Sequence, residues 1–179
     1  MLSTILAKSD CAACKFCCSF RRTSLWETPI FSEADLSKLK ELYPTAKFRP
    51  AENCGNSNNS YTFDISDQYK TDDPNEEALC PFLDPARGCS LPSELKPFDC
   101  KIWPLRVVSI PKQSESEPAQ LAVALTPTCP AINKVPLQKV RDLANNGLGK
   151  TILEYAAEHP DMVKEYSDFL STIVYTNPL

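Results

Sequence analysis

Glycine and histidine are scarce in this chain, whose 179 residues include four glycines and one histidine. So few glycines leave no GxGxxG loop for a dinucleotide, and the CxxxCxxC spacing of radical enzymes is absent as well. A single histidine, His159, also provides no Ser-His-acid or Cys-His catalytic arrangement. These absences argue against the common nucleotide-dependent and hydrolytic enzyme classes.

Long apolar runs and an excess of positive charge are missing too. No segment approaches the ~20 apolar residues that span a bilayer, and residues 1–8 lack the basic and apolar regions of a signal peptide. The net charge of −4 disfavours nucleic acid as a general partner. We therefore expect a cytoplasmic protein, with neither nucleic acid nor membrane as partner, whose thiols are kept reduced.

Cysteine, in contrast, is abundant, with nine residues. Cys11, Cys14, Cys17 and Cys18 form a C-x2-C-x2-C-C run. A two-residue gap lets a tight turn point two thiolates at one ion, and repeating the gap adds a third. Such density favours a metal or cluster site over buried apolar cysteines or a disulfide knot.

Further cysteines follow in proline-rich stretches. Cys80, Cys89 and Cys100 lie ~60–90 residues beyond the run, and Cys129 precedes another proline. We expect the first three to join the run, together with Cys129. Cys54 stands in an Asn-rich loop without a partner at ligand spacing, so we predict that it is not a ligand.

The expected ligand set is all sulfur, because His159 lies in the C-terminal region and we expect it to be a free surface histidine. Thiolates suit zinc or an iron–sulfur cluster and disfavour Mg²⁺, Ca²⁺ and two-His-one-carboxylate iron. Three sulfurs from one short loop slightly favour a [4Fe–4S] cluster, although spacing leaves zinc open. Either centre carries a charge of about −2. Six cations could offset it: Arg21, Arg22, Arg87, Lys96, Lys101 and Arg106.

The cysteine blocks together resemble the YkgJ-like family of cysteine-cluster proteins, whose domain is expected to chelate zinc or iron. The resemblance rests on the CxxCxxCC run, on Cys80-Pro81-Phe82-Leu83, and on the blocks at Gly88-Cys89, 96–104 and 129–131. Lys96 and Lys101 replace arginine, Trp103 replaces phenylalanine, and Ala131 replaces glycine. The resemblance implies a metal-binding module spanning residues 11–132.

Three roles stay open for such a centre. The first is a metal- or cluster-binding protein with a structural or redox role. The second is a cluster-dependent enzyme, since the motif is also similar to that of flagellin lysine N-methylases. The third is metal delivery or storage, which needs labile ligation. The sequence does not identify a protein partner.

The fold class indicated is α+β: a small irregular cysteine-cluster domain with a β-hairpin and a C-terminal helical segment. We predict a metal-binding domain over 1–134 and helices over 135–179 packed on it within the same unit. Apolar periodicity and capping residues predict the following elements: a helix from Ser32 to Pro44, a strand over 61–65, a hairpin of 105–110 with 120–125, and helices over 136–147, near 152–156 and over 162–173.

Overall fold

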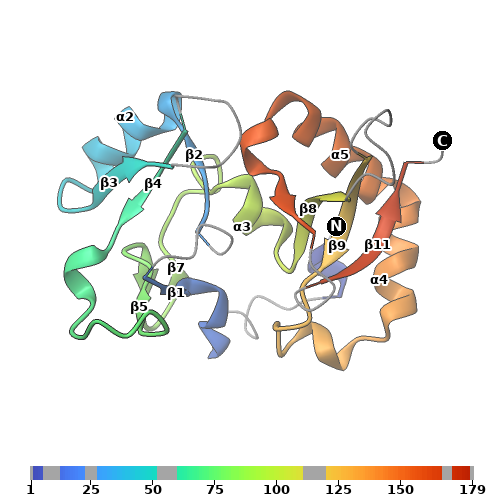
Figure 1. Cartoon of the computed structure of the whole chain (residues 1–179), viewed down its shortest axis with the longest axis horizontal. Coiled ribbons are helices and arrows are strands. Elements are labelled where there is room, and N and C mark those ends of the chain that lie inside the picture. The colour runs from blue at the N-terminus through green and yellow to red at the C-terminus, as the bar shows by residue number, and fades with distance from the viewer. Residues whose placement is uncertain are drawn as a thin grey trace.

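The computed structural model describes residues 2–5, 13–22, 28–51, 60–110, 120–166 and 171–177. In Figure 1 the helices and strands form two lobes, and the short helix α3 (Phe98–Ile102) lies between them. Each lobe combines helix with strand, so the predicted α+β class is confirmed. Within the described residues, no helix is long and apolar enough to cross a membrane.

Among the residues that the structure describes, the first lobe contains short strands and the helix α2 (Glu33–Leu42). Its main sheet is antiparallel, in the order β2 (Phe31–Ser32), β4 (Ser60–Asp64), β3 (Lys47–Pro50). Two separate antiparallel pairs complete it: β1 (Ser19–Arg21) with β5 (Glu77–Leu79), and β6 (Leu83–Asp84) with β7 (Gly88–Cys89). The single-turn helices are η2 (Phe16–Cys18) and η3 (Ser66–Gln68).

Helix α2 (Glu33–Leu42) begins and ends where its sequence predicts. The Ser32 side chain accepts a hydrogen bond from the backbone N–H of Asp35 at 3.2 Å, which satisfies one of the unpaired donors of the first turn. Leu36 and Leu39 are buried on one face, and Pro44 follows the last turn. The predicted strand is also present, as β4.

The core of the first lobe is rich in phenylalanine. Phe82 lies at its centre, with ring centroids 5.0 Å from Tyr43, 6.0 Å from Phe31 and 6.3 Å from Phe63. These rings meet edge to face, the arrangement that aromatic quadrupoles favour. Since Phe82 follows Cys80-Pro81, its burial fixes the second cysteine region to the lobe.

The second lobe is a four-stranded sheet with helices packed on it (Figure 1). The strand order is β10 (Lys164–Glu165), β8 (Leu105–Ile110), β9 (Gln120–Leu125), β11 (Thr172–Thr176). The helices are α4 (Leu137–Leu143) and α5 (Gly149–Glu158), joined by a wide turn over Ala144–Leu148. Single-turn helices occupy Leu2–Thr4, Ile132–Lys134 and Pro160–Met162.

The hairpin β8–β9 has the predicted bounds and is buried on both faces. Alternate side chains point to opposite sides of a strand. Leu105, Val107 and Val123 therefore pack in the core cluster that contains α4 and α5 residues, while Val108 and Ala122 pack in a separate cluster with Tyr166 and Ile173. Residues 111–119, which connect the two strands, lie outside the described residues.

The turn between α4 and α5 lies where the sequence predicts the end of a helix. Gly147 has φ 107°, in the region that favours glycine, as expected of a C-cap. The chain nevertheless continues at once into α5, the second predicted helix, so the two helices share a kink rather than a loop.

The third predicted helix, over 162–173, is wrong. Residues 164–165 form β10, parallel to β8, and residues 172–176 form β11, antiparallel to β9. The β-branched and aromatic residues Ile173, Val174 and Tyr175 suit a strand, and both edges of the hairpin need partners. Pairing with β8 and β9 therefore determines the secondary structure of this segment, whose apolar spacing alone does not distinguish helix from strand.

The two larger core clusters lie on either side of α3. The first contains buried residues between Phe20 and Leu95, and the second contains buried residues between Ile102 and Val174. The hairpin thus packs with the C-terminal helices, with α3 and with Cys129, and not in the core of the Cys80 segment. The division into 1–134 and 135–179 stays a prediction.

Candidate functional site

A left-handed turn shapes the cysteine run. Lys15 has φ 55°, uncommon for a residue with a side chain, and the Cys18 N–H donates to the Lys15 carbonyl at 3.0 Å. This turn leaves Cys14 exposed and Cys17 and Cys18 half-buried. Cys11 lies outside the described residues.

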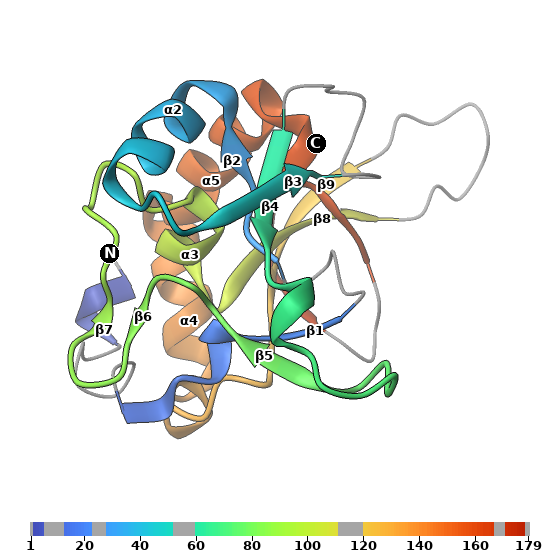
Figure 2. The same ribbon diagram turned by 90° about the vertical axis from the view of Figure 1, so that its left-hand side faces the viewer.

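Backbone hydrogen bonds join the run to the second cysteine region. The pairing of β1 with β5 places Ser19 opposite Leu79, and one residue further on the Cys80 N–H donates to the Cys18 carbonyl at 2.8 Å. Two segments about sixty residues apart in sequence are therefore adjacent at their cysteines. Figure 2 shows β1 and β5 side by side at the foot of the molecule.

The β6–β7 hairpin returns the chain from Cys80 to Cys89. Leu83 lies opposite Cys89, and its N–H donates to the Cys80 carbonyl at 3.0 Å. The turn is held by Asp84, whose Oδ1 accepts from the backbone N–H groups of Ala86 and Arg87 at 2.8 and 2.9 Å. These contacts hold the pKa of the Asp84 carboxyl below its usual range.

Helix α3 supplies the third cysteine region. Cys100 is half-buried, and the neighbouring Asp99 is buried in an ion pair with Arg106 of β8, with Oδ1 and Nη1 2.9 Å apart. The Arg106 guanidinium also lies over the Trp103 ring, 4.7 Å from its centroid. The helix is therefore fixed to the second lobe next to its thiol.

The thiols of the three regions affect one another. Burial raises the pKa of Cys80 to about 12, a backbone hydrogen bond from Phe82 opposes this, and Cys100, Cys89 and Cys17 raise it further. Burial likewise raises the pKa of Cys100 to about 12, against the lowering effect of Arg106.

At Cys17, a hydrogen bond with the Cys18 side chain, burial and the Cys18 charge raise the pKa, while Lys96 lowers it. A group of thiols this close favours the neutral form until a cation compensates the charge.

The predicted ligands thus fall into three groups. Cys14, Cys17, Cys18, Cys80, Cys89 and Cys100 come from segments that the fold brings together, and each is a free thiol. Cys129 is also free, but it is buried in the core of the second lobe beside Ile132. Cys11 and Cys54 are outside the described residues. Within the described part of the chain, no three Cys, His, Asp or Glu side chains are positioned to hold an ion.

Some of the cations predicted to compensate the thiolates lie near the thiols, and others do not. Lys96 and Arg106 lie within electrostatic range of the thiols. Arg22 is engaged elsewhere, 3.6 Å from the Glu76 carboxylate and 4.7 Å from the centroid of the Tyr69 ring.

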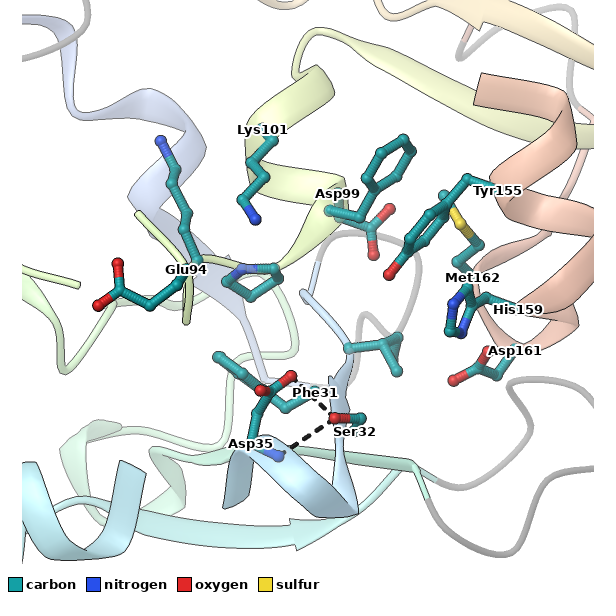
Figure 3. Close-up of a pocket in the computed structure, with 14 residues that line it drawn as sticks. Phe31, Ser32, Asp35, Glu94, Asp99, Lys101, Tyr155, His159, Asp161 and Met162 are labelled. Atoms are coloured by element: carbon teal, nitrogen blue, oxygen red, sulfur yellow. Dashed lines mark hydrogen bonds between the residues drawn. The ribbon is translucent and has the colours of Figure 1, made fainter. Parts of the chain in front are cut away.

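A cavity of about 240 Å³ opens on the other side of α3, between the lobes (Figure 3). The first lobe contributes Phe31 and Asp35, α3 contributes Asp99 and Lys101, and the second lobe contributes Tyr155, His159 and Asp161. Three rings are stacked at its wall: Phe98 on Tyr155 at 3.8 Å and Tyr155 on His159 at 4.2 Å.

Sequence reasoning missed this cavity. His159 was expected to be a free surface residue, but it is half-buried and stacked in the wall. Tyr155 and His159 are four residues apart, which places them on one helical face, and Asp161 follows two residues later. This local clustering of polar residues was a signal of a site in the sequence. The residues that α2 and α3 contribute to the cavity are brought there only by the tertiary structure.

Comparisons of the chain with protein-family models, curated proteins and solved structures find no match. The interpretation of the site therefore depends on its own residues.

Proposed function

We propose that this protein binds zinc or an iron–sulfur cluster through cysteine thiolates. The observation that carries the proposal is the backbone hydrogen bond from Cys80 to Cys18, which joins the Cys14–Cys18 and Cys80–Cys89 segments, with Cys100 within electrostatic range of Cys80. The pairing of β1 with β5 and the burial of Phe82 hold these segments in place without covalent links.

The donor set fits soft metal centres. Thiolate sulfur selects zinc and iron–sulfur clusters over Mg²⁺ or Ca²⁺, which prefer oxygen. Each of those centres uses about four ligands, fewer than the six described cysteines of these segments. We therefore propose Cys17, Cys80 and Cys100 as central ligands. Four further ligands are proposed: Cys11, Cys14, Cys18 and Cys89. Metal–sulfur bonds of ~2.3 Å require the thiols to close around the metal.

We propose the ligand role of Cys129 separately from that of the other cysteines. Its side chain is 5% exposed among apolar residues of the second core. A buried free cysteine also packs well as a small apolar residue. Metal content of a Cys129→Ala variant distinguishes these two roles.

A structural or redox role suits this centre best, because it lies where the two cysteine-bearing segments of the first lobe meet the helix between the lobes. The proposal agrees with the resemblance to the YkgJ-like cysteine-cluster family. Delivery or storage is the alternative favoured by the exposure of Cys14 and Cys89, because exposed ligands exchange more readily. A cluster-dependent transferase is a further alternative, and the cavity beside α3 is the feature that favours it.

The test is anaerobic purification followed by elemental analysis and a visible spectrum. Bound iron with broad visible absorbance identifies a cluster, whereas colourless protein with bound zinc identifies a zinc site. Protein that holds neither metal, before or after anaerobic reconstitution with each, overturns the proposal.

Variants then test the ligand set. Cys80→Ala and Cys100→Ala should lose most bound metal, because both replace central thiols. Cys54→Ala is the matched control and should retain it. If Cys80→Ala does not fold, thiolate-to-cobalt charge-transfer bands in cobalt-loaded wild-type protein supply an independent readout. Retention of full metal content by both ligand variants would contradict the assignment.

A further inference from the structure

The cavity between the lobes has an acidic end built from both lobes. Asp35 lies in the first turn of α2, and Asp161 follows α5. Ser32 donates to Asp35 at 2.8 Å, and Ser60 donates to Asp161. A carboxylate has about four acceptor sites, so each retains capacity for another donor. Within the described residues neither carboxylate forms an ion pair.

Tyr155 lies next to this acidic end. Burial raises the pKa of the Tyr155 phenol, and Asp161, Asp35 and Asp99 raise it further, which places all three carboxylates within electrostatic range of one hydroxyl. Asp99 is compensated by Arg106, and the carboxylate of Glu94, which also lines the cavity, is directed away from the open centre in Figure 3. Asp35 and Asp161 therefore supply the negative charge next to Tyr155. Figure 3 shows the Tyr155 hydroxyl and the Asp161 carboxylate directed towards the open centre.

The rest of the cavity is different in character. Phe31 and Met162 are buried in its wall, and the Tyr155 ring is stacked between Phe98 and His159. Lys101 enters from α3, on the side away from Asp35 in Figure 3. The cavity thus combines an apolar wall with charged groups from both lobes, and in a ligand site a few convergent polar groups fix the orientation of the ligand.

We propose that this cavity binds a small primary-ammonium compound. The ammonium group lies between Asp35 and Asp161 and donates to their carboxylates and to the Tyr155 hydroxyl oxygen. The carbon chain lies against Phe31 and Met162. The volume of about 240 Å³ limits the ligand to one smaller than a drug-sized molecule, since pockets for those measure ~300–1,000 Å³.

Charge sets the specificity of the site. Asp35 and Asp161 attract a cation, whereas the other uncompensated charges of the lining, two lysines (Lys96 and Lys101) against one glutamate (Glu94), disfavour a second one. The site therefore takes a monoamine in preference to a diamine, and it rejects a simple carboxylate of the same length. This inference is independent of the proposed metal function, because none of the cavity's lining residues is a cysteine.

The experiment is calorimetric titration of the purified full chain with butylammonium, butyrate and 1,4-diaminobutane. Butylammonium should bind saturably at one site, 1,4-diaminobutane more weakly, and butyrate not measurably. Asp161→Asn and Asp35→Asn should each weaken butylammonium binding about tenfold, the effect expected for loss of a charge-assisted hydrogen bond.

Two matched controls accompany these variants. Glu158→Gln and Glu33→Gln make the same charge change on exposed residues near Asp161 and Asp35 and should bind within about twofold of wild type. Tyr155→Phe, which keeps the ring stack, should weaken binding about threefold.

Absence of saturable butylammonium binding to folded wild-type protein overturns the proposal. Equal effects of Asp161→Asn and Glu158→Gln also overturn it, because they would show a general charge effect. Circular dichroism and metal content of each variant identify any variant that fails to fold. If Asp161→Asn fails to fold, the comparison of Asp35→Asn with Glu33→Gln provides the test, because both residues lie in the capped first turn of α2. Loss of metal with butylammonium binding intact would affect only the proposed metal function.

Discussion

Asp99 and Arg106 form a buried ion pair that invites a direct test of what holds α3 in place. Their side chains are 2% and 4% exposed, and the charged atoms are 2.9 Å apart. Their alignment is not that of a hydrogen bond, so the attraction is chiefly Coulombic. Asp99→Asn removes the negative charge with little change of shape and so removes this ion pair from the buried Arg106 guanidinium.

The expected loss follows from burial. Removing one partner of a buried pair costs about 3–5 kcal/mol, and for a chain of this length each kcal/mol lowers Tm by about 2–4 °C. Asp99→Asn should therefore lower Tm by roughly 6–20 °C. Arg106→Met should cost more, because it also removes the stacking on Trp103, which contributes about 0.5–2 kcal/mol.

The double variant separates the pair from its surroundings. With both charges gone, no isolated charge remains, so the double variant should be more stable than the sum of the single losses predicts, by about 1–3 kcal/mol. Urea unfolding followed by circular dichroism measures this, on samples of matched metal content because bound metal adds its own free energy.

Asp67→Asn in the exposed Lys47–Asp67 pair is the control and should have no measurable effect, since both side chains are more than half exposed. The reasoning is refuted if Asp99→Asn destabilises the protein no more than Asp67→Asn does. Strict additivity in the double variant would refute it equally.

Three other predictions concern local structure and protons. Ser32→Ala should lower the free energy of unfolding by about 0.5–2 kcal/mol in urea titrations through loss of the α2 cap, and a smaller effect than that of the exposed Ser37→Ala control would contradict the cap. Gly149→Ala should cost about 1–3 kcal/mol in the same assay, because its new methyl group would overlap the Tyr175 ring; additional replacement of Tyr175 by Leu should restore part of the loss. Metal-free protein should lose stability as pH rises from about 9 to 12, because folded Cys80 and Cys100 have pKa values of about 12 and stay protonated while the unfolded thiols ionise near 9. Metal-loaded protein should instead lose stability as pH falls, because protons compete with the metal for the thiolates. Thermal melts across pH measure both trends, and the same trend in both forms would contradict the prediction.

Local patterns in the sequence predicted the elements that local physics controls. The Ser32 cap, the apolar runs of 105–110 and 120–125 and the left-handed glycine at 147 each act within a few residues, and each element formed at its predicted place. The C-terminal strand β11 was missed because its partner, β9, lies about fifty residues earlier and no local pattern records that pairing.

The candidate sites show the same difference between local patterns, which the sequence records, and long-range contacts, which it does not. Spacing identified the cysteine segments, and the Cys18–Cys80 contact lies where two of them meet. The cavity was not predictable, because Asp35, Asp99 and Asp161 are far apart in sequence and each is ordinary in its own segment. The central place of Phe82 follows from packing of rings from four separate positions, which composition alone does not specify.

The sheet of the second lobe has a consequence for how the protein is made. The strands β8 and β9 are completed early in synthesis, but the segments that cover their outer edges, β10 and β11, emerge about forty to fifty residues later. At ribosomal rates of ~5–20 residues per second, the apolar hairpin waits about 2–10 s with both edges unpaired. The first lobe has all its strands by then. The nascent chain therefore passes through a stage in which one lobe can be complete while the other offers open strands, the stage at which a chaperone that holds extended apolar segments would be most useful.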